Sequence, residues 1–288
     1  MFPWWLAEVE GIIILNKHKH GKIQQKSNKK RYIWLSVLAT LLVAAVIVIF
    51  WRISTPETTS DSQVLKAAIV DQLSTTYPDD NFNKTITASL EADGFQVDLY
   101  QGAQVTVSFY QNLPSHGYKL IILRTHSGMM QSPQSSQQAV SLFTNEPFNP
   151  LKHLLEQLNH QLMKVQVNDN SPLLFGIPPN FITENVKGNF DNAVVIVSGC
   201  SGLYEDNLAR AFGQKGASAF LSWDGSVNLD YVDNATIDLV KNLTSNDNTL
   251  AKAVNATMVA IGPDPAFNSY LKYFPTDAGN LPLKELIH

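Results

Sequence analysis

Two runs of mainly aliphatic residues limit the possible folds of this chain more than any other feature. Ala193–Ser198 is almost entirely β-branched and leads through a glycine to Cys200. Tyr118–Arg124 has the same design and leads through a threonine to His126. Runs without apolar–polar alternation are typical of parallel strands that are covered on both faces. The sequence therefore predicts two buried strands, one ending beside a thiol and the other beside an imidazole.

Strand and helix patterns alternate along the rest of the chain from Leu65 onwards. Further strands are expected at 65–73, 95–100 and 217–223, and helices at 79–93, 203–213, 233–243 and 249–259. This alternation predicts a three-layer α/β/α sandwich with a mostly parallel sheet. The stretch 129–190 interrupts it, so we expect an insertion there, with a helix over 151–162 and a hairpin over 165–175.

An uncharged stretch, residues 32–51, precedes this domain. About twenty apolar residues are needed for a helix to cross the hydrocarbon core. A buried core helix of that length rarely lacks all charge, and a signal peptide has a shorter apolar region. We therefore expect one transmembrane helix at 32–52, with the lipid bilayer as partner.

The charges around this stretch predict its orientation. A basic cluster lies before it, whereas Arg52 is the basic residue that follows directly. The positive-inside rule then keeps 1–31 in the cytoplasm and places the domain 64–288 outside it, after a polar linker at 53–63. Asn-X-Thr triplets, which are N-glycosylation patterns, begin at Asn83, Asn234, Asn242 and Asn255.

Composition excludes several classes of function. A net charge of -4 gives no support for nucleic-acid binding. A single cysteine excludes a disulfide within the chain. Because His116, His153 and His160 have no partners at metal-ligand spacing, we expect no metal site. We also expect no cofactor. The oligomeric state stays open.

His126 and Cys200 form the candidate catalytic pair. Ligands of a parallel sheet bind beyond the carboxyl ends of its strands, so the two loops meet if their strands are neighbours. An imidazole beside a thiol is the arrangement that nucleophilic cysteine catalysis requires. Taken singly, such a cysteine is more often a small core residue and such a histidine is usually structural or exposed. Their matching positions favour catalysis.

Small residues follow both members of this pair. Gly128, Gly199, Ser201 and Gly202 would let backbone amides turn towards a developing oxyanion. A helix beginning near Leu203 would direct its N-terminus towards the thiol and lower the thiol pKa.

The strand–His–Gly motif at 118–128 and the strand–Cys segment at 194–224 resemble the caspase-like clan of cysteine peptidases. This clan includes gingipains, clostripain, legumain, separase and the CHAT domains. The likeness to gingipain-type and CHAT domains is most specific in Asn-Leu-Ala-Arg-Ala-Phe to Ser-Trp-Asp at 207–224, and the resemblance covers about 65–258. The chain departs from the clan pattern in that Ser127 separates His126 from Gly128, and Gly199 replaces the more usual alanine.

The resemblance implies a caspase–haemoglobinase fold with strand order 2-1-3-4-5-6. It also implies His126 as general base or leaving-group acid and Cys200 as nucleophile. Ser222, Trp223 and Asp224 would then line the pocket for the residue before the scissile bond, and an acidic group there would favour Arg or Lys.

Three functions follow, in order of preference. The first is a membrane-anchored extracytoplasmic cysteine endopeptidase with a Cys–His dyad that acts on a peptide or protein substrate. The second is a catalytically inactive caspase-like domain that serves as an anchored peptide-binding, protein-binding or sensor module. The third, a solute-binding or flavodoxin-like domain, is disfavoured because no Gly-rich phosphate loop follows the first strand.

Overall fold

The computed structural model describes residues 33–34, 37–38, 40–47, 64–131, 138–245 and 248–288. The chain divides into two compact units, Met1–Ser62 and Gln63–His288. Among the described residues, no helix combines the length and the apolar character needed to cross a membrane. The expected segments 1–31 and 53–63 and parts of the expected span 32–52 lie outside the described residues, so the anchor stays a prediction.

A six-stranded sheet forms the centre of the second unit. Its strands are β1 (Leu65–Asp71), β2 (Phe95–Gln101), β3 (Leu120–Arg124), β8 (Val194–Ser198), β9 (Ala219–Trp223) and β10 (Leu271–Phe274). They lie in the order β2-β1-β3-β8-β9-β10, in which only β10 is antiparallel to its neighbour. Counted along the chain, this is the order 2-1-3-4-5-6 that the resemblance implied, and the mostly parallel α/β sheet is confirmed.

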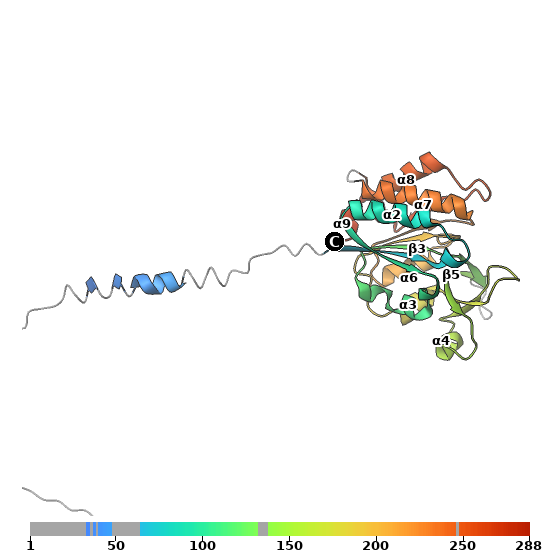
Figure 1. The fold of residues 1–288 in the computed structure, drawn as a ribbon, viewed down its shortest axis with the longest axis horizontal. Coiled ribbons are helices and arrows are strands. Elements are labelled where there is room, and N and C mark those ends of the chain that lie inside the picture. Colours follow the sequence, from blue (N-terminus) through green and yellow to red (C-terminus); the bar gives the residue numbers. More distant parts are fainter. Residues whose placement is uncertain (1–32, 35–36, 39, 48–63, 132–137, 246–247) are drawn as a thin grey trace, which may run out of the picture. The chain divides into compact units, whose positions relative to one another are not determined.

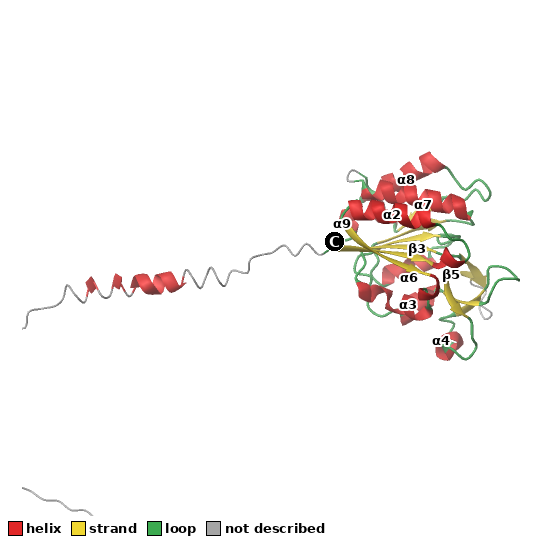
Figure 2. Cartoon of the chain, in the orientation of Figure 1, coloured by secondary structure: helices red, strands yellow, loops and turns green. Residues whose placement is uncertain are grey.

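Helices cover both faces of this sheet (Figures 1 and 2). One face carries α2 (Asp80–Ala92), α7 (Leu229–Thr244) and α8 (Leu250–Ile261), and the other carries α3 (Val107–Asn112), α5 (Pro179–Asn185) and α6 (Asn207–Gln214). The short α9 (Leu283–Leu286) and the 3-10 turns η1 (Gln72–Thr75), η2 (Gly102–Gln104), η3 (Leu113–His116) and η4 (Thr276–Asn280) complete the unit. Alternate residues of each strand enter opposite cores: in β1, Ala67 and Ile69 face α2 and α7, whereas Ala68 and Val70 face α3 and α6. Burial on both faces explains the uninterrupted apolar runs.

The expected insertion forms a second, antiparallel sheet of four strands, in the order β4-β5-β7-β6. Its strands are β4 (Ser127–Gln131), β5 (Gln138–Pro147), β6 (Met163–Val165) and β7 (Leu174–Ile177). The β6–β7 pair is the expected hairpin. The helix expected over 151–162 is wrong in length, because α4 is only Leu154–Leu158. Its leucines are exposed, and a short helix without tertiary packing does not extend.

The four Asn-X-Thr triplets differ in accessibility. Asn234 and Asn255 are exposed on α7 and α8. Asn83 is buried, and its Nδ2 donates to Asp71 Oδ2 over 2.9 Å. Asn242 is half-buried and donates to Asp238 and Thr257.

Candidate active site

The carboxyl ends of β3 and β8 bring the two candidate residues into adjacent loops. These strands are neighbours, with Arg124 opposite Ser198, and His126 and Cys200 each lie two residues beyond that pair. Ser127 Oγ donates a 2.6 Å hydrogen bond to the backbone O of Cys200. The two loops are therefore tied side by side.

Gly199 allows this close approach. A Cβ at this position would overlap the backbone O of Thr125 and lie 2.8 Å from Ser127 Oγ. No residue with a side chain fits there unless the His126 loop moves. The small residue before the cysteine is therefore required by contact with the neighbouring loop.

The His126 loop is held from both sides. The backbone N of His126 donates to Gln72 Oε1 over 2.9 Å, and its backbone O accepts from Phe143 N over 3.0 Å. The imidazole lies against the Phe143 ring, with 5.9 Å between ring centroids. Burial, followed by the positive charge of Arg124, lowers the pKa of His126. The imidazole is therefore mainly neutral at pH 7 and is able to accept a proton.

The Cys200 thiol contacts the backbone of Val227. Sγ accepts from Val227 N over 3.4 Å and donates to Val227 O over 3.6 Å. Burial raises the pKa of Cys200; the Val227 N–H counteracts this, and the Asp264 carboxylate raises the pKa further. Among the described residues, no hydrogen bond joins the His126 imidazole to Sγ. Both groups are thus neutral in this state, so forming the thiolate at neutral pH requires a base that removes the thiol proton.

This raised pKa predicts slow alkylation of Cys200 at neutral pH. The thiolate is the reactive form, so the rate with iodoacetamide will rise steeply only at alkaline pH. Since the chain has a single cysteine, the modified mass reports Cys200 alone. The same chain in concentrated urea is the matched control, and its rate–pH curve should have the lower midpoint. A folded-state midpoint at or below that of the unfolded chain would contradict the neutral thiol.

The small residues around the thiol have defined places. Ser201 has a left-handed backbone (φ 59°), and its N donates to Gly225 O over 2.8 Å. Gly202 packs against Ser222, and a Cβ there would overlap Ser222 Oγ. Gly128 lies in β4 opposite Ser141. Their role towards an oxyanion stays a prediction.

The expected helix start beside the thiol is wrong. The helix begins at Asn207 rather than near Leu203, so its N-terminus is not next to Cys200 in the chain. The residues between Cys200 and this helix form turns, because their backbone N–H groups do not make helical hydrogen bonds. Leu203 N donates to Trp223 O, and Tyr204 N donates to Ser201 O.

The three residues expected to line a substrate pocket lie in different environments. Ser222 is buried and donates to Val197 O over 3.0 Å. Trp223 is also buried. Asp224 keeps 23% of its side chain exposed, but it forms a 2.8 Å ion pair with Lys272 and accepts from Tyr270 N. Of these three, Asp224 is the one that offers a charged group to solvent.

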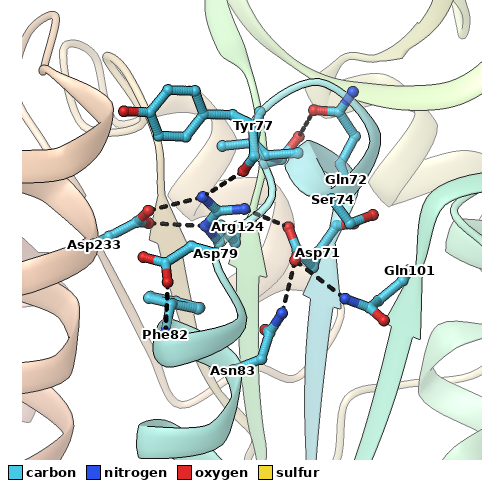
Figure 3. Close-up of polar contacts among 12 residues, drawn as sticks. Asp71, Gln72, Ser74, Tyr77, Asp79, Phe82, Asn83, Gln101, Arg124 and Asp233 are labelled. Atoms are coloured by element: carbon cyan, nitrogen blue, oxygen red, sulfur yellow. Dashed lines mark hydrogen bonds and ion pairs between the residues drawn. The ribbon is translucent and has the colours of Figure 1, made fainter.

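A buried ion network lies at the base of the His126 loop (Figure 3). Arg124 donates from Nη1 to Asp71 over 2.7 Å, and from Nε and Nη2 to Asp233 over 2.9 and 2.8 Å. Nη2 also donates to Tyr77 O. The guanidinium is fully buried and lies over the Phe82 ring. This network joins the ends of β1 and β3 to α7.

Sequence reasoning missed three residues of the site. Gln72 directly follows β1, at a carboxyl end of the sheet where ligands bind, but the expected strand over 65–73 placed it inside the strand. Val227 acts through its backbone, for which the sequence carries no signal. Asp264 is buried and accepts from the backbone N of Asn228, Ala266 and Phe267. In the part of the chain that the structure describes, no group of three or more His, Cys, Asp or Glu side chains is placed to hold a metal ion.

Comparisons with known proteins add little to this geometry. No protein-family model and none of the curated proteins compared matches the chain. Among solved structures, the chain is similar to the crystal structure of the Drosophila initiator caspase Dronc, with a TM-score of 0.37 and 10% sequence identity. That match covers 76% of this chain and 82% of the caspase chain. A structural similarity this low carries no weight for fold or function. Any proposal for the function therefore depends on the strand order and on the geometry of the site.

Proposed function

We propose that residues 63–288 form a caspase-like cysteine endopeptidase domain that uses Cys200 and His126. The observation that carries the proposal is the pairing of the two loops at equivalent ends of neighbouring strands, tied by Ser127. The order of the whole sheet also supports it, because counted along the chain it is the order 2-1-3-4-5-6 that the resemblance implies.

The neutral pair defines the sequence of proton transfers. His126 accepts the thiol proton as Sγ attacks the peptide carbonyl carbon, which gives a tetrahedral intermediate. The imidazolium then donates that proton to the leaving amine, the C–N bond breaks, and an acyl-thioester remains on Cys200. Water, deprotonated by His126, hydrolyses the thioester and restores the thiol. Before attack, Sγ must leave its contacts with Val227 and turn towards the imidazole.

Two finer features belong to the same proposal. Asp224 gives the enzyme a preference for Arg or Lys before the scissile bond, and a basic substrate side chain would compete with Lys272 for its carboxylate. Backbone amides around Gly199, Ser201 and Gly202 stabilise the oxyanion. For Ser201, this requires release of its bond to Gly225 O.

We also propose that residues 32–52 anchor the chain in a lipid bilayer with the domain outside the cytoplasm. The uncharged stretch and the basic cluster before it support this. A C-terminal tag should then be removed by protease added outside intact cells. A tag that is protected in intact cells and cleaved after lysis would contradict this orientation.

A peptidyl acyloxymethyl ketone with Arg at its reactive end tests the enzyme proposal on the full chain. We expect the wild type to form one covalent adduct on Cys200 under reducing conditions, and Cys200→Ala to form none. His126→Gln should react about 100-fold more slowly, because a positioned general base contributes about that much. A matched probe with Leu in place of Arg tests the basic preference.

An inactive binding module is the second candidate. The observation that favours it is the thiol held by Val227 without a hydrogen bond to the imidazole. A folded wild type that reacts no faster with the probe than Cys200→Ala would exclude the endopeptidase. Saturable binding of the same peptide in reversible form would then support the binding module.

A further inference from the structure

Gln72 occupies a third strand end in the candidate site. It directly follows β1, which pairs with β3, the strand that leads to His126. Its side chain is buried, with 1% of the residue exposed. A long amide side chain is rarely buried to this extent unless both of its ends have hydrogen-bond partners.

Both ends of the Gln72 amide have partners. Oε1 accepts from His126 N over 2.9 Å and from Thr125 Oγ1 over 3.4 Å. Nε2 donates to Asn145 Oδ1 over 2.9 Å. If the amide rotated by half a turn, its NH₂ group would face the His126 N–H, which is donor against donor. The Gln72 amide therefore has a single favourable orientation in this site.

Asn145 fixes that orientation from the second sheet. Its Nδ2 donates to the backbone O of Gln72 over 2.9 Å and to Gly102 O over 3.0 Å, so its Oδ1 is left to face Gln72. Asn145 lies in β5, two residues beyond Phe143, which binds the backbone O of His126 and packs against its ring. The two anchors of His126 are thus Gln72 and Phe143, and Asn145 connects them, because it lies in the same strand as Phe143 and binds Gln72.

We propose that Gln72 is the positioning residue for His126: its buried carboxamide, locked by Asn145, fixes the loop that presents the imidazole to Cys200. Gln72 does not touch the reacting atoms and acts only through His126. The inference rests on the proposed function, in which a displacement of about 1 Å costs about 100-fold in rate.

The imidazole signal of His126 tests the position of the ring without any need for activity. The full chain, labelled with ¹³C at histidine Cε1, is compared by NMR with Gln72→Leu and Gln72→Glu, and His126→Gln assigns the resonance. We expect Gln72→Leu to shift or broaden the His126 signal and to change its titration. Gln72→Glu keeps an acceptor oxygen for His126 N but turns its second oxygen towards Asn145 Oδ1, acceptor against acceptor, so its His126 signal should be perturbed less than that of Gln72→Leu without returning to the wild-type state.

Asn83→Leu is the matched control, because Asn83 is also a buried amide at this end of the sheet. It binds Asp71 and makes no bond to the His126 loop. We expect this variant to lose stability comparable to Gln72→Leu while its His126 signal stays unchanged. An equal change in both variants would mean that Gln72 is merely structural.

Kinetics with the Arg probe complete the test. In Gln72→Leu, the maximal rate of labelling should fall about 100-fold with little change in the concentration for half-maximal rate, and Gln72→Glu should recover only part of it, because it keeps the bond to His126 N but loses the bond to Asn145. An unshifted His126 signal in folded Gln72→Leu overturns the positioning role, whatever the activity. An unreactive wild type whose His126 signal does respond to Gln72→Leu overturns the endopeptidase instead.

Discussion

Arg124→Met will lower the free energy of unfolding of the domain by about 3–5 kcal/mol, which is the usual effect of removing one partner of a buried ion pair. Arg124 lies within hydrogen-bonding distance of Asp71 and Asp233, and all three side chains are almost fully buried. Methionine fills much of the same volume but leaves two carboxylates facing each other without a cation. The loss comes mainly from these unpaired charges.

Urea denaturation followed by circular dichroism measures this effect. Arg210→Met is the matched control, because Arg210 in α6 forms an exposed ion pair with Asp206, the N-cap of that helix, and its loss should change the unfolding midpoint little. Adding Asp71→Asn and Asp233→Asn to Arg124→Met should recover part of the stability, since the unpaired charges are then gone. A loss below about 1 kcal/mol for Arg124→Met would mean that water or movement solvates both carboxylates.

Gly199→Ala will separate the two loops of the candidate site. The new methyl group would overlap a backbone oxygen, which cannot rotate away as a flexible side chain can. The backbone must therefore shift, at a cost of about 1–3 kcal/mol of stability. Because the shift moves the His126 loop away from Cys200, we also expect labelling by the Arg probe to slow at least about tenfold.

Gly213→Ala is the control that isolates the steric effect of the substitution at Gly199. Both variants restrict the unfolded chain equally, but a Cβ at Gly213 meets no atom within 4 Å, and the residue lies in α6. Alanine should stabilise this helix by up to about 1 kcal/mol and leave labelling unchanged. Similar unfolding curves and labelling rates for the two variants would show that the loops are not in close contact.

The four central strands of the main sheet were predictable from the sequence because they are buried on both faces. Val194–Ser198 and Leu120–Arg124 read as apolar throughout, and their positions followed within two residues. The helix pattern failed in the insertion, where leucines from Leu151 to Leu162 recur at helical spacing and indicate a longer helix than α4. The spacing of apolar residues shows which of them share a helix face. It does not show whether that face packs against a core.

The candidate site was predictable only in part. His126 and Cys200 carry recognisable side chains at strand ends, so the adjacency of their loops followed from the sheet. Arg124 looked like the polar end of an apolar strand, because its partner Asp233 lies 109 residues away. The thiol contacts the backbone N and O of Val227. Because every residue has these atoms, no sequence pattern predicts this contact.

The chain enters β4 directly after His126, whereas Cys200 follows β8. The imidazole is thus connected along the chain to the antiparallel sheet, and the thiol to the parallel one. His126 is bound by Gln72 at the end of β1 and by Phe143 in β5, so its position depends on the contact between the two sheets. Under the proposed function, a molecule that displaced the second sheet from the first would therefore impair the pair without touching either reacting group.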